Sequence, residues 1–161
     1  MRHGKAEPFA ADDYERVLTD RGLRSAEDAG RHLSETGNVP DFAVVSSSAR
    51  TQQTWAAVDA ASQSGAQLSV DDTVYSGSPD VVLEALRAVP ADSRVVIFVG
   101  HNPSAATLAN QLDDGNGDPA AISGMLQGFP AGALVILEVE LLWSELGTET
   151  GRVIDFYVGT G

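Results

Sequence analysis

The stretch Arg94-Val95-Val96-Ile97-Phe98-Val99-Gly100-His101-Asn102-Pro103 joins an apolar run to a polar turn and then to a helix start. Five consecutive apolar residues are typical of a strand that is buried on both faces, as the strands of parallel sheets are. Asn102 followed by proline is a favourable helix N-terminus. The stretch therefore predicts a strand over 94–99 and a helix that begins at Pro103 with Asn102 as its cap.

Strands and helices alternate along the rest of the chain in the same way. Further strands are expected at 42–45, 67–70, 133–139 and 152–158, and further helices from Thr19 to Gly37, over 49–61 and from Ser78 onward. His32 falls off the apolar stripe of the first of these helices and is expected at the surface. Residues 9–18 lack clear periodicity and predict a loop over or beside the functional site, whereas the segment up to Pro130 predicts a loop or an irregular helix.

This alternation of strands and helices predicts an α/β fold. We expect a single domain over residues 1–161, in which a mostly parallel central sheet is covered by helices on both faces as a three-layer α/β/α sandwich. The sequence has no internal repeats and no linker long enough to divide it.

Composition restricts the classes of protein to which the chain can belong. Its 161 residues suit one domain with a sizeable core, and 43% of them are hydrophobic, as in an ordinary globular protein. The absence of cysteine excludes a disulfide framework and a cysteine nucleophile. A formal net charge of −13 argues against nucleic acid or an anionic membrane as a partner. No apolar run approaches the roughly 20 residues of a membrane span, and we expect a cytoplasmic protein.

Three polar stretches offer two histidines and two arginines. Arg2-His3-Gly4 opens the chain, Arg50 follows the strand at 42–45 after three serines, and His101 follows the strand at 94–99. Ligands of parallel sheets gather at the carboxyl ends of the strands, so these side chains are expected to meet in one site. An imidazole can act as a nucleophile, and arginine binds phosphoryl oxygens bidentately. The set therefore suits a phosphoryl group. Lys5, Ser47 and Ser48 could add to it or be ordinary surface and strand-end residues.

The Arg2-His3-Gly4 opening, the stretch from Ser47 to Thr54 and the Gly100-His101-Asn102-Pro103 turn resemble the histidine phosphatase (phosphoglycerate mutase-like) superfamily. The short length and the Arg-His-Gly-Lys-Ala-Glu opening are similar to its small SixA-type phosphohistidine phosphatase branch. The resemblance implies a phosphoglycerate mutase-like fold with His3 as the nucleophile and Arg2, Arg50 and His101 as the phosphate pocket. It implies a phosphorylated protein or a small phosphate ester as substrate. No metal or other cofactor is expected, because the cations are built in, and we expect a monomer or a weak dimer.

The sequence departs from the family at the residue that gives a proton to the leaving group. Many members carry a carboxylate in the segment that corresponds to residues 71–79, and at the matching place, residues 73–77, this chain reads Thr-Val-Tyr-Ser-Gly. A good leaving group, such as the imidazole of phosphohistidine, depends less on an acid than an alkoxide does. Glu7, Asp12 and Asp80 are either alternative donors or, as the more common case, solvated surface carboxylates. We therefore expect a phosphatase for activated substrates, and the rival hypothesis is a phosphate-binding regulatory module with little turnover.

A second departure concerns the residues before the opening motif. In the family, an apolar strand at the centre of the sheet leads into Arg-His-Gly, whereas here only Met1 precedes Arg2. Loss of a central strand would leave two strands with unpaired edges. The expectation is that the first strand is incomplete in this sequence and that an upstream segment completes it.

Overall fold

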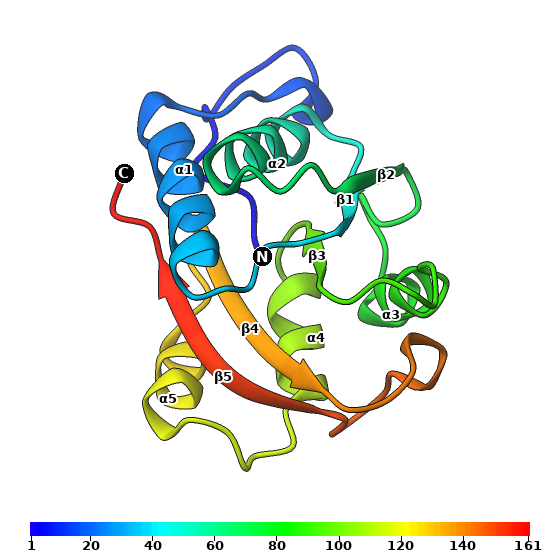
Figure 1. Ribbon diagram of the computed structural model, residues 1–161. Helices are drawn as coiled ribbons and strands as arrows, with labels where there is room; N and C mark the ends of the chain where they lie inside the picture. The colour runs from blue at the N-terminus through cyan, green and yellow to red at the C-terminus, as the bar shows by residue number, and fades with distance from the viewer.

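The computed structural model describes residues 1–161, and Figure 1 shows its five α-helices and five strands. The strands are β1 (Phe42–Ser46), β2 (Gln67–Asp71), β3 (Val96–Val99), β4 (Ala133–Val139) and β5 (Gly151–Val158). The helices are α1 (Asp20–Glu35), α2 (Ala49–Ser62), α3 (Pro79–Arg87), α4 (Ser104–Leu112) and α5 (Pro119–Gln127), with short 3-10 turns η1 (Asp13–Glu15) and η2 (Trp143–Glu145). The mixed α/β class predicted from the alternation of apolar segments is confirmed.

The strands form two sheets. Three parallel strands lie in the order β2-β1-β3, while β4 and β5 form an antiparallel pair. Val44 of β1, for example, lies between Ser69 of β2 and Phe98 of β3. The connections from β1 to β2 and from β2 to β3 contain α2 and α3, as crossover connections between parallel strands require. Because β1 and β3 are neighbours, the residues that follow them, Arg50 and His101, come out at the same edge of the sheet.

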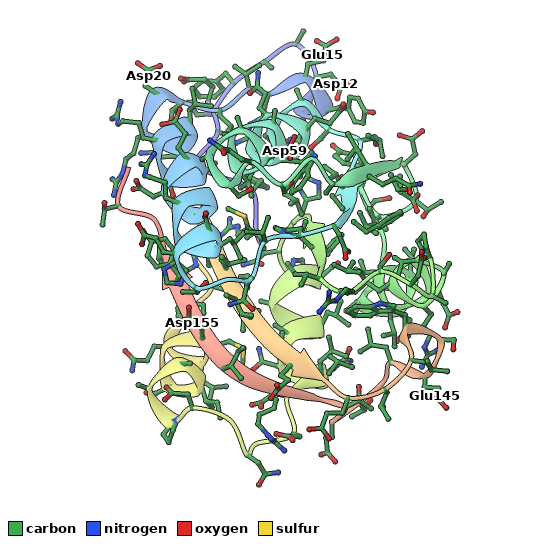
Figure 2. All side chains as sticks on the ribbon, in the orientation of Figure 1. Asp12, Glu15, Asp20, Asp59, Glu145 and Asp155 are labelled. Carbon is green, nitrogen blue, oxygen red and sulfur yellow. The ribbon has the colours of Figure 1, made fainter.

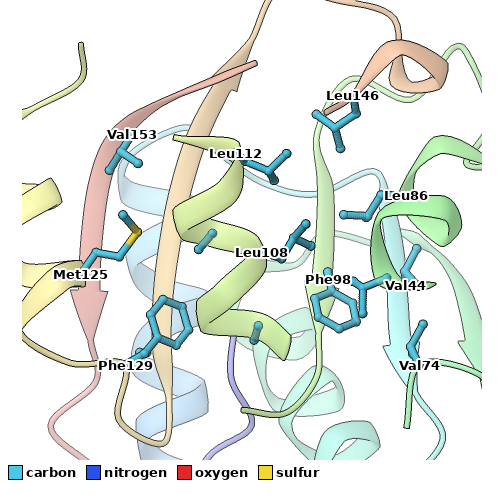
Figure 3. Packing of buried hydrophobic residues seen from close by; sticks show 14 of the residues in the cluster. Val44, Val74, Leu86, Phe98, Leu108, Leu112, Met125, Phe129, Leu146 and Val153 are labelled. Atoms are coloured by element: carbon cyan, nitrogen blue, oxygen red, sulfur yellow. The ribbon is translucent and has the colours of Figure 1, made fainter. Parts of the chain in front are cut away.

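Alternate side chains of the central strands enter two separate apolar clusters. Ala43 of β1 and Ile97 of β3 pack with buried residues of α1 and α2. Their neighbours Val44 and Phe98 point the other way and pack with residues of α3, α4 and α5, as Figure 3 shows. Successive strand residues face opposite sides of a sheet, so the continuous apolar runs of the sequence are explained by burial on both faces. This core fixes the strand ends that carry the site.

The first three residues lie between the two sheets. The amide of His3 donates to Gly100 O at 3.0 Å and that of Gly100 to Met1 O at 3.1 Å, while the amide of Arg2 donates to Ala133 O at 2.9 Å. The N-terminus accordingly lies in the middle of the molecule in Figure 1. The opening motif is thus held on one side by the end of β3 and on the other by the start of β4.

An apolar cavity of about 340 Å³ continues from Met1 between β3 and β4. Phe98 and Leu134 are among the residues that line it. The α-amino group of Met1 donates to Phe98 O at 2.8 Å, and burial lowers its pKa from 8.0 to about 5. A buried amine of this kind favours its neutral form because charge is costly away from water.

Three local predictions differ from the structure. The helix after β3 begins at Ser104 with Pro103 in the cap position, and the side chain of Asn102 instead donates to Phe129 O at 2.9 Å. The segment before Pro130 contains the regular helix α5, which has its own cap, because the Asp118 carboxylate accepts from the amide of Ala121 at 2.8 Å.

His32 is the third difference. It is not a free surface residue, because its ring is paired with Asp155 and stacked on Tyr157 with ring centroids 4.1 Å apart. The helical stripe did not identify this contact, since both partners lie on β5, more than 120 residues away in sequence. Separately, none of the helices combines the length and the apolar character that crossing a membrane would need.

Candidate active site

His3 is held with one ring nitrogen fixed. Its Nδ1 lies 2.7 Å from Gly4 O, and since a carbonyl can only accept, Nδ1 carries the hydrogen and Nε2 keeps its lone pair. Burial, the largest cause, together with Arg50 and Arg2 lowers the pKa of His3 to about 4, against the opposing effect of the hydrogen bond to Gly4 O. The ring is therefore neutral near pH 7, as a nitrogen nucleophile must be.

The turn after His3 needs glycine because two backbones approach closely. A Cβ on Gly4 would lie 2.5 Å from the carbonyl oxygen of Gly22 in α1. The amide of Gly4 donates to Thr54 Oγ1 at 3.0 Å, and this hydroxyl donates in turn to Arg50 O at 2.7 Å. The same glycine thus links the opening motif to α1 and to the first turns of α2.

Arg50 lies in the first turn of α2 and its side chain is only 7% exposed. Its Nη1 donates to Asp13 O at 2.6 Å and its Nη2 to Asp13 Oδ2 at 2.9 Å. Its Nε is buried and has no hydrogen-bond partner in the protein, and the same holds for Nε of Arg2. Buried donors without a partner are rare and cost free energy. Two such guanidinium donors in one place fit an oxyanion.

Arg2 is oriented by the loop before β4. Its Nη1 donates to Phe129 O at 3.0 Å, the same carbonyl that accepts from the side chain of Asn102. Burial lowers the pKa of Arg2, but an arginine remains charged at neutral pH. The loop therefore aligns Arg2 with the turn that carries His101.

His101 faces His3 across the site. The ring centroids of His3 and His101 are 5.2 Å apart. Nε2 of His101 lies 2.8 Å from the buried Ser46 Oγ, and Nδ1 lies 3.4 Å from Nη2 of Arg50. Burial first, and then His3 and Arg50, lower the pKa of His101 to about 3. Because arginine can only donate, this contact favours the lone pair on Nδ1 and the hydrogen on Nε2, toward Ser46 Oγ. When the Ser46 hydroxyl donates to Nε2 instead, the hydrogen of the neutral ring is on Nδ1 and can be offered to an anion beside Arg50.

The structure brings together the four side chains that the sequence singled out, Arg2, His3, Arg50 and His101. Ser47 and Ser48 were possible additions to the site. The Ser48 hydroxyl is hydrogen-bonded within the protein, with its Oγ 2.7 Å from Thr51 Oγ1, whereas Ser47 Oγ is buried without a partner. Lys5 is exposed, and its backbone carbonyl accepts from Thr19. No side-chain hydrogen bond or ion pair joins a suggested proton donor to the four. These suggested donors are Glu7, Asp12 and Asp80.

Two residues of the site were not identified from the sequence. Asp13 of η1 accepts from Arg50, from Arg16 at 2.8 Å and from the hydroxyl of Tyr75 at 2.8 Å. The ring of Tyr75 lies edge-on to His101 with centroids 5.4 Å apart. Segment 9–18 was expected beside the site, but no periodic pattern distinguishes Asp13 from its acidic neighbours. The one available signal was the Asp-x-x-Arg spacing of Asp13 and Arg16.

The site holds two arginines, two neutral imidazoles and no group that is both acidic and protonated near pH 7. Hydrogen bonds from Arg16, Tyr75 and Arg50 hold the pKa of Asp13 well below its usual range, so this carboxylate is ionised. No cluster of three or more His, Cys, Asp or Glu side chains that could hold a metal ion is present. Together with the α/β fold, the pocket defines the class: a protein of the histidine phosphatase superfamily.

Solved structures identify the branch. No protein-family model matches the chain. A protein from Nakamurella multipartitia assigned as the phosphohistidine phosphatase SixA is 31% identical, with a TM-score of 0.88 over 100% of this chain and 94% of that one. A SixA from Agrobacterium tumefaciens is 26% identical with a TM-score of 0.79, covering 98% and 94% of the two chains. An uncharacterized protein of Mycobacterium tuberculosis is 29% identical over 98% of this chain and 99% of its own length. The chain belongs to the SixA-type branch of the histidine phosphatases.

Proposed function

We propose that the chain is a metal-independent phosphatase that works through a phosphohistidine intermediate on His3. The observation that carries this is a neutral imidazole, with its lone pair on Nε2, beside two guanidinium groups whose buried Nε atoms have no partner. The donors that would bind the phosphoryl oxygens thus lie on Arg2 and Arg50, next to the His3 ring that would attack phosphorus. Arg2, Arg50 and His101 are proposed to hold the phosphoryl oxygens.

The reaction proceeds in two displacements. Nε2 of His3 attacks phosphorus, a P–N bond forms, and the bond to the leaving group breaks with its electron pair going to that group. Water then attacks the phosphorus of phosphorylated His3, a P–O bond forms as the P–N bond breaks, and the electron pair of the P–N bond returns to Nε2. Inorganic phosphate leaves with the hydrogens of the water, or loses one of them to solvent. Charge on the equatorial oxygens in each transition state is stabilised by Arg2 and Arg50. One such donor contributes on the order of 3 kcal/mol.

The substrate is proposed to be a phosphohistidine of a protein, or a small phosphate compound with a similarly good leaving group. Both imidazoles are neutral near pH 7 and Asp13 is ionised, so the pocket has no strong acid to protonate an alkoxide. The SixA assignment of the relatives supports the same substrate class. The enzyme is further proposed to be a single three-layer α/β/α domain, cytoplasmic, monomeric or weakly dimeric, and without nucleic acid or membrane as a partner.

Trapping the phosphoenzyme tests this function. Wild-type protein mixed with a radiolabelled phosphoryl donor such as phosphoramidate is expected to give a protein-bound label that is stable in base and labile in acid. His3→Ala should give none, and His32→Ala, which changes a histidine remote from the site, should label normally. A label that persists in His3→Ala would overturn the mechanism. Binding of phosphate without turnover of phosphoramidate or p-nitrophenyl phosphate would favour the regulatory module instead.

A further inference from the structure

The solvent-facing side of the pocket is built by Asp13 and Tyr75. The Asp13 side chain is 54% exposed, whereas that of Arg50, which it contacts, is 7% exposed, so Asp13 lies on the outer side of Arg50. The Tyr75 hydroxyl is 2.8 Å from the same Asp13 Oδ2, and its ring packs edge-on against His101. His3 is held from inside by β3 and β4. Asp13 and Tyr75 contact Arg50 and His101 from the solvent side, so a leaving group that departs in line toward solvent would meet this pair.

Asp13 and Tyr75, which form the mouth of the pocket, can offer a ligand only hydrogen-bond acceptors. Asp13 is ionised and can only accept. The single hydroxyl hydrogen of Tyr75 is donated to Asp13 Oδ2, which leaves the phenol oxygen with acceptor capacity alone, and this bond is the largest cause that raises the pKa of Tyr75. Two cations are nearby: Arg50 donates to Asp13 from the inner side, and Arg16 donates to Glu7 O at 2.7 Å and to Asp13 Oδ1.

The surroundings of the mouth are acidic. Tyr14 follows Asp13, packs against Tyr75 with ring centroids 5.2 Å apart, and its hydroxyl lies 3.4 Å from Asp72 Oδ1. Asp12 and Glu15 flank the same turn in Figure 2 and are exposed. A leaving group that carries N–H donors or positive charge is matched by such a rim, while one that offers only acceptors or negative charge is not.

We propose that Asp13 and Tyr75 recognise the leaving group and select phosphoryl compounds whose leaving nitrogen group presents an N–H toward them. This inference rests on the proposed function and adds specificity residues to it. For a phosphoimidazole protonated on its distal nitrogen, that N–H is bonded to Asp13 or to the Tyr75 oxygen. When His3 attacks, the P–N bond breaks, its electron pair neutralises the ring, and the distal proton stays in place. Neutral imidazole departs, and no proton from the enzyme is needed.

A purely structural alternative is that Asp13 only orients Arg50. Two substrates with good leaving groups separate this alternative from the proposal. The leaving group of N-phosphoimidazole carries an N–H when protonated, whereas that of p-nitrophenyl phosphate has none. Asp13→Asn keeps an oxygen to accept from Arg50 but removes the charge. It is expected to lower kcat/KM for N-phosphoimidazole at least about tenfold more than for p-nitrophenyl phosphate, since a hydrogen bond to a charged group is worth more than one to a neutral group. An equal loss for both substrates would show that Asp13 acts through Arg50 alone.

Two further variants complete the test. Glu140→Gln removes an exposed carboxylate that belongs neither to the site nor to its acidic rim, and the ratio of kcat/KM for N-phosphoimidazole to kcat/KM for p-nitrophenyl phosphate should stay at the wild-type value. Tyr75→Phe keeps the ring against His101 and removes the oxygen, so the ratio should fall, and this variant decides the matter if Asp13→Asn does not fold. If Asp13→Asn and Tyr75→Phe are folded and the ratio of the two kcat/KM values is unchanged, the inference is overturned, but the proposed phosphatase function still stands. Turnover of neither substrate by the wild type would instead overturn the proposed function.

Discussion

The imidazole rings of His3 and His101 face one another at a centroid distance of 5.2 Å, with their planes inclined by 60°. Each ring is partly buried beside arginines, and His3 also lowers the pKa of His101. The pair is therefore neutral over a wider pH range than free histidine, whose pKa is near 6.5.

This neutrality predicts an unusually low acid limit for activity. Protonation of His3 removes the nucleophile, and burial and the arginines lower its pKa to about 4. The logarithm of kcat/KM, corrected for ionisation of the substrate, is expected to stay level down to about pH 5 and to fall as the pH passes through about 4. Rates are measured with p-nitrophenyl phosphate, and circular dichroism at each pH confirms that the protein is folded. An acid limb near pH 6.5 in folded protein would contradict the neutral pair.

Arg50→Lys should reduce catalysis without a comparable loss of fold. Lysine keeps the charge but cannot bind Asp13 and the phosphoryl oxygens with the fixed fork of a guanidinium. We expect kcat/KM to fall about 100-fold, the usual effect of losing one transition-state donor. Steady-state kinetics measure this, and Arg24→Lys, at an exposed position of α1, is the matched control. Full activity of Arg50→Lys would remove Arg50 from the phosphate pocket.

Gly4→Ala should destabilise the protein and disturb the nucleophile together. The added Cβ would lie 2.5 Å from the Gly22 carbonyl oxygen, and neither backbone can move without shifting α1 or His3. The free energy of unfolding in urea is expected to fall by about 1–3 kcal/mol, as for other overpacked sites. Gly147→Ala, where the nearest atom would be 3.5 Å away, serves as the control. Equal stability of the two variants would show that the contact relaxes.

In a protein produced with Met1 as its first residue, the buried amine predicts a pH dependence of stability. Its pKa is about 5 in the folded protein and about 8 when unfolded. The unfolded chain therefore binds the extra proton between these values, and stability falls as the pH drops from 8 to 5, by up to about 1.4 kcal/mol per pH unit. Urea unfolding at several pH values measures the slope.

Two extensions of the chain before Met1 separate the amine from the cavity beside it. Both convert the amine to an amide, so both should reduce this slope. A Gly-Ser extension does no more, whereas five apolar β-branched residues can also enter the cavity between β3 and β4. The apolar extension should add at least about 2 kcal/mol over the Gly-Ser control, the value of one large buried side chain. Equal stability of the two extended proteins would show that the cavity does not accept a strand.

The sequence was sufficient for the parts of the fold that depend on local patterns. Continuous apolar runs located β1 and β3, and Thr19 was recognised as the cap of α1, where its Oγ1 accepts from the amide of Gly22 at 3.0 Å. Residues at strand ends converge by topology, and for this reason Arg50 and His101 could be placed together before the structure was known.

The rest depends on contacts between distant segments. The partnership of Asp13 with Tyr75 joins residues 62 positions apart through loop conformations that have no periodicity. The pairing of His32 with Asp155 is similar. The separation of β4 and β5 from the parallel sheet also could not be predicted, because apolar runs do not record which strands are hydrogen-bonded to each other.

Because His3 lies between the two sheets, its position depends on the β4–β5 hairpin staying in contact with the parallel sheet. Its amide is bonded to Gly100 at the end of β3, and its carbonyl accepts from Gly132 just before β4. Breathing of the β4–β5 hairpin away from the parallel sheet would release one of these anchors while the helices and β1 to β3 stayed intact. Such partial opening requires less free energy than global unfolding. Heat or urea should then inactivate the enzyme before most of its secondary structure is lost, and amide exchange at Arg2 and Gly132 should report the same event.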